Sequence, residues 1–269
     1  MYRLKKCAIV LALALAVVSA ALAESGEFGS AGVFQFPASD AGGSTFAESE
    51  PQQSEQQQTE QLQQSADGLV IPTATLSPQV AALPWNLMLV NRENPVPDDW
   101  EVELVTLGNG CQVDKRIMPD LQAMFDACRA AGLLPMVNTA YRTYDDQQRM
   151  LVNKYRQFRN AGYSHTEAQK EALKLANYPG YSEHQLGLAV DIDSSNTNVC
   201  SNEAVWKWMI KHCHEYGFIW RYPSVKTGIT GINNEYWHFR YVGVDAATYI
   251  MQNEMCLEEY LQEFYGIPY

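Results

Sequence analysis

Apolar residues are distributed unevenly along this 269-residue chain, and only its C-terminal part can bury a hydrophobic core. Residues 24–83 contain eight acidic residues, no Lys or Arg, and a Gln-rich block from Gln52 to Gln64. They lack the apolar periodicity that offsets the entropy lost when a chain becomes ordered. We therefore expect residues 24–83 to form a disordered linker rich in Gln, Ser and Glu, and residues 84–269 to form one folded domain.

The first 23 residues have the pattern of a secretory signal peptide. Basic residues precede an apolar run from Cys7 to Val18, and the segment from Ala21 to Ala23 fits the small-x-small pattern that signal peptidase recognises. A retained N-terminal anchor is the alternative, because the run becomes marginally long enough to span a bilayer if it extends to Ala23. In both cases we expect an exported chain that acts outside the cytoplasm, either secreted or tethered to the membrane by residues 1–23.

Charge and hydropathy argue against two classes of protein. The formal net charge is −12, the pI is near 4.8 and the sequence has no basic cluster, so nucleic acid is not an expected partner. A mean hydropathy of −0.27 argues against a protein with several membrane spans. We expect the domain to be a monomer.

The cysteines do not form a recognisable metal site. Five would remain after removal of residues 1–23, so at least one thiol would be free or paired with another chain. No Cys-x-x-Cys pair is present, which disfavours a zinc site built from cysteines. Cys200 and Cys213 flank an expected helix whose ends would lie about 20 Å apart at 1.5 Å per residue, so they should not pair with each other. The other pairings are not determined by the sequence.

Periodicity, capping residues and glycines predict the secondary structure from residue 84 onward. The expected helices are residues 116–131, 144–160, 164–175, 201–215, 246–254 and 257–265. The expected strands are residues 133–137, 186–192, 218–222 and 235–242, with a turn at residues 226–231. Because most helices precede the strands instead of alternating with them, the fold class is α+β, with helices packed around a small antiparallel sheet.

Two segments carry the residue types of a catalytic zinc site. His184 and Asp191 belong to the first and His238 to the second, and two imidazoles with one carboxylate leave a fourth zinc position open. Seven extended residues would separate His184 from Asp191 by roughly 23 Å, so both can contact one ion only if the chain reverses between them. Gly187 permits this reversal. Asp193 shares a strand face with Asp191, and the spacing does not choose between the two carboxylates.

Glu235 is the candidate general base. On a straight strand, residues i and i+3 face opposite sides, so Glu235 and His238 converge only if the strand is twisted or bulged between them. The preceding Asn233-Asn234 turn is compatible with that irregularity. We therefore expect Glu235 at the start of the strand and outside its regular part.

Each of these residues also has a structural explanation. A single histidine is more often a hydrogen-bonded structural residue than a metal ligand, and an Asp that ends a strand is often only a cap. Three other histidines, His165, His212 and His214, lie on expected helices, where we expect structural or exposed roles.

Six segments carry more specific motifs. They are residues 89–95 (LVNRENP), 113–117 (VDKRI), 141–147 (YRTYDDQ), 179–191 (PGYSEHQLGLAVD), 216–223 (YGFIWRYP) and 235–243 (EYWHFRYVG). Taken in this order, they resemble the VanY-type zinc D-alanyl-D-alanine carboxypeptidases, and the resemblance covers about residues 87–245. The most specific part is the S-x-H-x-x-G-x-A-x-D string followed downstream by E-x-W-H.

This resemblance implies a fold, a metal site and a set of catalytic residues. The fold would be the α+β fold shared with the hedgehog signalling domain. One zinc ion would be held by His184, Asp191 and His238, with Glu235 as base, so the resemblance selects Asp191 over Asp193.

The resemblance also implies the residues that meet the substrate. Arg142 would face the pocket and stabilise negative charge on the substrate, whereas without the family a surface ion pair with Asp145 or Asp146 would be the simplest role for this residue. Gln147 and Ser182 match family positions that line the substrate site.

The implied reaction is removal of the C-terminal D-alanine from a peptidoglycan stem peptide. An L,D-carboxypeptidase that acts on tetrapeptide stems would use the same catalytic residues, so the sequence hardly separates these two activities. Further alternatives are an endopeptidase that cuts within the stem and a non-catalytic cell-wall-binding module. The presence of Glu235 and of all three ligands argues against the module.

Overall fold

The structure, a computed structural model, describes residues 74–269. The expected signal peptide or anchor and the expected linker up to residue 73 lie outside the described residues. Within the described part, no helix is long and apolar enough to cross a membrane.

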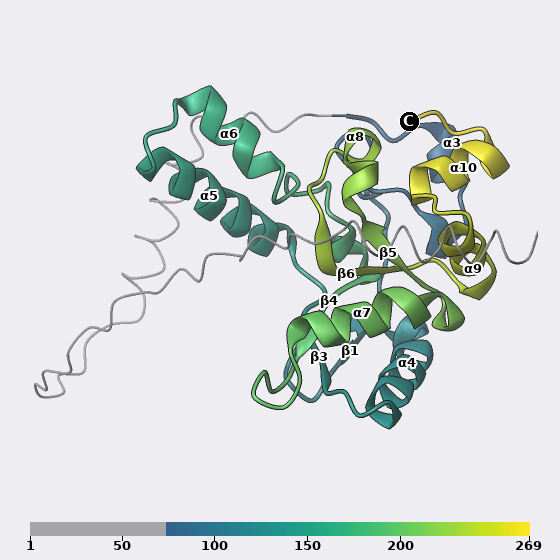
Figure 1. Ribbon diagram of the computed structural model, residues 1–269. Coiled ribbons are helices and arrows are strands. Elements are labelled where there is room, and N and C mark those ends of the chain that lie inside the picture. Colours follow the sequence, from purple (N-terminus) through teal and green to yellow (C-terminus); the bar gives the residue numbers. More distant parts are fainter. Residues whose placement is uncertain (1–73) are drawn as a thin grey trace, which may run out of the picture. The chain divides into compact units, whose positions relative to one another are not determined.

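A four-stranded antiparallel sheet with the strand order β3-β4-β6-β5 carries Asp191 on β4 and both Glu235 and His238 on β6 (Figure 1). The strands are β3 (Pro135–Thr139), β4 (Ala189–Ser194), β5 (Phe218–Tyr222) and β6 (Glu235–Tyr241). Side chains alternate along β4, so Val190 and Ile192 lie fully buried in the core and Asp191 between them points to the other face. This alternation places a carboxylate on the face that does not carry these two core side chains.

Helices and short helical turns surround this sheet, which confirms the α+β class. They are α3 (Pro78–Ala81), α4 (Met118–Ala130), α5 (Tyr144–Asn160), α6 (His165–Leu173), α7 (Asn202–His212), α8 (Thr227–Thr230), α9 (Val244–Gln252) and α10 (Leu257–Tyr265). Helix α7 contacts β4, β5 and β6, and α4 contacts both α7 and β3. Helices α5 and α6 pack against each other as a pair (Figure 1).

Capping residues explain where each of the helices α5 and α6 begins. The side chains of Thr143 and Ser164 each accept a hydrogen bond from the backbone N–H three residues later, and the carboxylate of that later residue accepts one from the backbone N–H of the capping residue. Below these caps, a small separate core formed by Leu151, Tyr155 and alanines of α6 joins the two helices. The bounds predicted for α5 and α10 from caps and periodicity are confirmed.

The folded domain begins earlier than residue 84, so the prediction of disorder up to residue 83 is wrong for its last residues. Ser77 caps the short helix α3, and its hydroxyl accepts a hydrogen bond from the N–H of Val80. The side chains of Val80 and Leu83 are buried in the main core. Burial of these two apolar side chains offsets the entropy of ordering a short segment that has little periodicity of its own.

A second sheet, the hairpin of β1 (Leu104–Thr106) and β2 (Gln112–Asp114), was not expected from the sequence. Its strands have three residues each, too few for an alternating pattern to be visible. The hairpin supports the loop that carries His184, because the N–H of Asp114 donates a hydrogen bond to the carbonyl of Gly187 at 3.0 Å.

Most predicted elements are present with shifted ends. The strand expected from residue 186 starts at Ala189, because residues 183–186 form a 3₁₀ turn that closes at Gly187. The helices expected at residues 116–131 and 201–215 each include a 3₁₀ turn at one end, and the expected turn at residues 226–231 contains α8. Amphipathic spacing does not distinguish 3₁₀ turns from α-helix ends.

Candidate metal centre and active site

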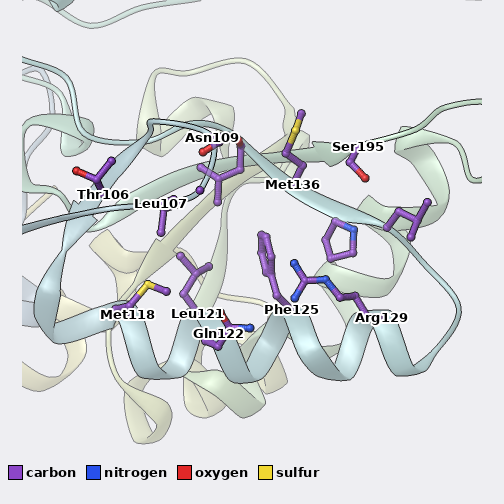
Figure 2. Close-up of a pocket in the computed structure, with 14 residues that line it drawn as sticks. Thr106, Leu107, Asn109, Met118, Leu121, Gln122, Phe125, Arg129, Met136 and Ser195 are labelled. Atoms are coloured by element: carbon purple, nitrogen blue, oxygen red, sulfur yellow. Dashed lines mark hydrogen bonds between the residues drawn. The ribbon is translucent and has the colours of Figure 1, made fainter.

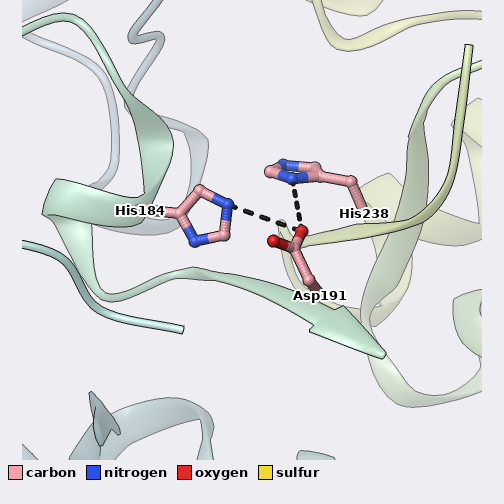
Figure 3. Close-up of side chains that lie close together, drawn as sticks. All are labelled: His184, Asp191 and His238. Carbon is pink, nitrogen blue, oxygen red and sulfur yellow. Dashed lines mark hydrogen bonds and ion pairs between the residues drawn. The ribbon is translucent and has the colours of Figure 1, made fainter. Parts of the chain in front are cut away.

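His184, Asp191 and His238 come together on one side of the sheet (Figure 3). His184 lies in the 3₁₀ turn before Gly187, Asp191 lies on β4, and His238 is its direct partner on β6. One ligand atom from each of the three side chains lies within 4.8 Å of the others, and all three residues are buried.

The predicted chain reversal at Gly187 is confirmed. Its φ of +75° is in the left-handed region, which costs glycine little. A Cβ at this position would lie 3.1 Å from the Val102 side chain and 3.2 Å from the backbone nitrogen of Asp114. Gly187 therefore satisfies both the backbone conformation and the close packing that bring His184 back toward Asp191.

Hydrogen bonds fix which nitrogen of each imidazole faces the cluster. His184 Nδ1 is 2.7 Å from the carbonyl of Ala140, which can only accept, so Nδ1 carries the proton and Nε2 is directed at Asp191. His238 is turned the other way: Nδ1 is 3.0 Å from Asp191 Oδ1 and Nε2 is 3.4 Å from Glu183 Oε2.

This donor set fits a zinc ion. Two imidazole nitrogens and one carboxylate oxygen converge, and the ring nitrogen of each histidine that points away from the cluster has a hydrogen-bond acceptor. Zinc sites with an open coordination position use three such ligands, and an acceptor behind each imidazole is the usual way to orient it.

The protonation states of the two histidines differ because their surroundings differ. Burial and the charge of Arg142 lower the pKa of His184 to about 4. Burial acts to lower the pKa of His238 as well, but its hydrogen bonds with Asp191 and Glu183 raise the pKa to about 9. At neutral pH without metal, His184 is therefore neutral and His238 is charged.

These pKa values predict that zinc binding releases a proton. A zinc ion held by His238 Nδ1 would need the free electron pair of that nitrogen, and below a pKa of about 9 the imidazole is protonated in the metal-free protein. The apparent zinc affinity should therefore rise about tenfold per pH unit between neutrality and pH 9 and then level off. Chelator competition at several pH values measures this slope, and an affinity that does not change between pH 7 and pH 9 would contradict it.

Glu235 is the first residue of β6, as predicted. The pairing of β5 with β6 shifts register between Trp220 and Tyr222, so the regular ladder does not extend to Glu235. The indole N–H of Trp220 donates to the Glu235 carbonyl at 2.9 Å and holds this irregular start in place. As a result, Glu235 and His238 converge, with 3.7 Å between Oε2 and Nδ1.

The electrostatic environment of Glu235 suits a proton acceptor. Burial raises its pKa to about 7, although the positive charges of His238 and Arg142 partly oppose this effect. A base with a pKa near the working pH both exists in the deprotonated form and accepts protons readily.

Arg142 points toward the cluster and not toward solvent. Its Nη2 lies 3.4 Å from Asp191 Oδ2 and its Nη1 donates to Gln147 Oε1 at 2.7 Å. The alternative of a surface ion pair with Asp145 or Asp146 is wrong, because the largely buried Arg142 pairs with Asp191 and Gln147 instead. Among the described residues, the buried Nε of Arg142 has no hydrogen-bond partner.

A small pocket of about 40 Å³ adjoins the cluster. Arg142, Gln147 and Ser182 line it together with His184, His238 and Glu235. Gln147 is held in place because its amide nitrogen donates to the carbonyl of Asn177 at 2.8 Å. The three residues expected to meet a substrate thus surround the same cavity as the expected base and the two expected histidine ligands.

A wider pocket elsewhere on the domain lacks these chemical groups. It has a volume of about 430 Å³ and lies between the β1–β2 turn, α4 and β3 (Figure 2). Phe125, Leu121 and Met136 are among its lining residues, Arg129 is its single charged residue, and no His, Asp or Glu lines it. The residues predicted for catalysis therefore line the smaller pocket and not this one.

Asp193, His165 and His212 have hydrogen-bond partners outside the cluster, whereas the buried Nδ1 of His214 has none among the described residues. The carboxylate of Asp193 accepts hydrogen bonds from Asn138 at 3.0 Å and from the Trp206 indole at 3.2 Å, and it is not a member of the metal-ligating group. His165 bonds with the Tyr155 hydroxyl and His212 with Glu215.

Comparison with known proteins agrees with this geometry. Residues 110–244 match the family model of VanY, described as D-alanyl-D-alanine carboxypeptidase. A D-alanyl-D-alanine carboxypeptidase of Enterococcus faecalis is 47% identical over 188 residues, which cover 70% of this chain and 70% of that protein. This chain belongs to the VanY family.

Two solved structures of VanY proteins are also similar. VanYB in complex with D-alanine-D-alanine is 46% identical, covers 67% of this chain and 99% of its own, and has a TM-score of 0.66. A glutamate-to-alanine variant of the vancomycin resistance D,D-pentapeptidase VanY, in complex with Zn(II), is 47% identical, covers 66% of this chain and 99% of its own, and has a TM-score of 0.65.

Sequence reasoning missed one residue of this VanY-family site. Glu183 is buried directly before His184, and its carboxylate contacts His238 from the side opposite Asp191. An acidic residue between Ser182 and His184 was visible in the motif, but nothing in the spacing indicated that its partners lie on β5 and β6.

Proposed function

We propose that the chain is a zinc-dependent D-alanyl-D-alanine carboxypeptidase that removes the C-terminal D-alanine from peptidoglycan stem peptides. The observation that carries this proposal is the convergence of His184, Asp191 and His238 in one buried cluster, with Glu235 beside it. Membership of the VanY family and the two similar VanY structures support it.

In this proposal each residue of the cluster has one task. His184 Nε2, His238 Nδ1 and one Asp191 oxygen hold a single zinc ion. When bound, zinc lowers the pKa of a water molecule toward about 7 and polarises a carbonyl group. Glu235 takes the proton from the attacking water at its carboxylate and returns it to the nitrogen of the departing D-alanine.

Arg142, Gln147 and Ser182 would bind the substrate. The guanidinium of Arg142 is held by Gln147 at one end and keeps a free Nε donor. Such a group can donate two hydrogen bonds to the terminal carboxylate or to the oxyanion that develops on the scissile carbonyl. Ser182, buried at the pocket wall, would contribute a hydroxyl contact.

We further propose that the chain acts outside the cytoplasm, where peptidoglycan stem peptides occur. The basic and apolar pattern of residues 1–23 supports export, either as a secreted protein or with these residues as a membrane tether. The acidic, Gln-rich segment that follows would then act as a spacer between membrane and domain.

Peptide hydrolysis by the purified full chain tests the proposal. The substrates are a pentapeptide stem that ends in D-Ala-D-Ala, the tetrapeptide stem, and the pentapeptide with an amidated C-terminus. We expect release of D-alanine from the pentapeptide, loss of this activity with a chelator, and recovery on addition of zinc.

Each other outcome contradicts the proposal in a recognisable way. Preferential cleavage of the tetrapeptide would indicate an L,D-carboxypeptidase, and undiminished cleavage of the amidated peptide would indicate an endopeptidase. Binding of all three peptides without any hydrolysis at full zinc loading would indicate a non-catalytic wall-binding module.

A further inference from the structure

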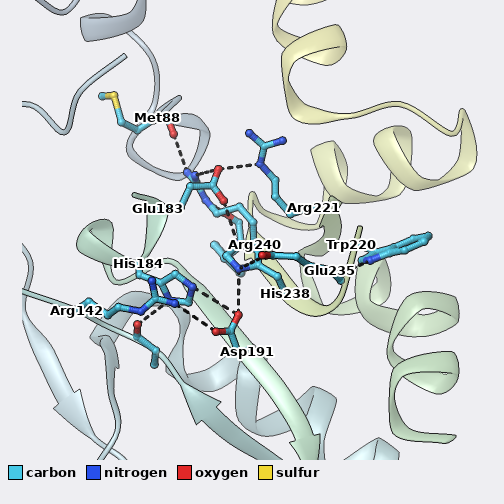
Figure 4. Close-up of polar contacts among 12 residues, drawn as sticks. Met88, Arg142, Glu183, His184, Asp191, Trp220, Arg221, Glu235, His238 and Arg240 are labelled. Atoms are coloured by element: carbon cyan, nitrogen blue, oxygen red, sulfur yellow. Dashed lines mark hydrogen bonds and ion pairs between the residues drawn. The ribbon is translucent and has the colours of Figure 1, made fainter. Parts of the chain in front are cut away.

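Glu183 belongs to a fully buried network of charged groups next to the candidate metal site (Figure 4). It lies on the side of His238 opposite Asp191. Its other members are Arg221 on β5, Arg240 on β6 and Glu258 on the C-terminal helix α10. Each of the four side chains is at most 1% exposed. A buried charge is costly unless it is paired and hydrogen-bonded, so this network requires a specific arrangement.

The two oxygens of Glu183 have different partners. Oε1 accepts hydrogen bonds from Arg221 Nε at 2.8 Å and from Arg240 Nη1 at 3.0 Å. Oε2 lies 3.4 Å from His238 Nε2. The two arginines therefore fix the orientation of the carboxylate, and its second oxygen faces the imidazole.

The arginines are themselves held by other groups. Glu258 accepts two hydrogen bonds from Arg221, at 2.8 and 2.6 Å, and the carbonyl of Met88 accepts one from Arg240 at 2.9 Å. Two carboxylates and two guanidiniums balance in charge. The carboxylate of Glu183 thus stays ionised in the interior and accepts a hydrogen bond from a ring N–H.

We propose that Glu183 is a positioning residue for the metal ligand His238. It accepts the Nε2–H of His238, which keeps the proton on Nε2 and the electron pair of Nδ1 directed at Asp191 when metal binds. This inference rests on the proposed ligand set. It means that the charged network of Glu183 with residues of β5, β6 and α10 contributes to metal binding as well as to the stability of the fold.

A matched pair of variants, Glu183→Gln and Glu258→Gln, tests the proposal. Both remove one carboxylate charge from the same buried network at constant side-chain size, but only Glu183 contacts His238. Zinc affinity of the metal-free protein is measured by chelator competition, which does not depend on activity. We expect Glu183→Gln to weaken zinc binding about 10–100-fold and Glu258→Gln to change it by less than about threefold.

Equal losses of zinc affinity in the two variants, or unchanged affinity in Glu183→Gln, would overturn the proposal. His238→Ala separates this failure from failure of the ligand set: if His238 is not a ligand, His238→Ala keeps its zinc affinity. If Glu183→Gln does not fold, nitrogen NMR of the zinc-loaded wild-type protein decides. We expect the His238 proton on Nε2 and the metal on Nδ1, and the reverse assignment would overturn the proposal.

Discussion

Replacing Glu235 with Gln is expected to lower kcat about 10²–10⁴-fold while the protein still binds one zinc ion, because the amide keeps the size of the side chain but cannot accept a proton. Glu235 lies beside the three-residue cluster and is not part of it. The change would therefore remove the proposed base and leave the proposed ligands in place. The measurements are kcat on the D-Ala-D-Ala pentapeptide and the zinc content of the same preparation.

His238→Ala provides the comparison, since it should lose both zinc and activity. Equal loss of zinc in the Glu235 and His238 variants would contradict the separation of base and ligand. Full activity of Glu235→Gln would show that another group accepts the proton.

Replacing Arg142 with Lys is expected to lower kcat/KM about 10²–10³-fold, because lysine keeps the charge but loses the fork that donates two hydrogen bonds. Arg142 is largely buried and directed at Asp191 and Gln147. Arg149→Lys is the matched control, since Arg149 is about half exposed and pairs with Asp146 on the same helix. We expect the control to retain wild-type kcat/KM.

The same pair of variants distinguishes two roles for Arg142. If the guanidinium binds the terminal carboxylate, the difference between wild type and Arg142→Lys should shrink on a C-terminally amidated peptide. If it stabilises the developing oxyanion, the difference should persist. Equal effects of Arg142→Lys and Arg149→Lys on the normal substrate would exclude both roles.

The sequence predicted which residues converge better than it predicted the residues that position them. His184, Asp191, His238 and Glu235, the proposed ligands and base, were selected from residue types in two short motifs, and the structure brings them together. Spacing alone did not separate Asp191 from Asp193, because both share one face of β4. The structure does, since Asp191 is the residue opposite His238 on β6, whereas Asp193 pairs with Met136 on β3.

Residues and strands that position the site through partners distant in sequence were not predictable. Glu183 is adjacent to the proposed ligand His184 in sequence, yet its proposed role depends on Arg221 from β5 and Arg240 from β6. The β1–β2 hairpin likewise holds the Gly187 loop through a backbone hydrogen bond, which carries no side-chain signature. By contrast, α5 and α10 were predicted with their observed bounds because capping residues, glycine and periodicity are local signals.

Zinc stoichiometry in Asp191→Asn and Asp193→Asn tests the central claim most directly. The two residues lie on one face of one strand, and only Asp191 reaches both histidines. We expect wild type and Asp193→Asn to bind one zinc ion per chain and Asp191→Asn to bind far less. A wild-type protein that folds but takes up no zinc, or an Asp191→Asn variant that retains a full equivalent, would contradict the account.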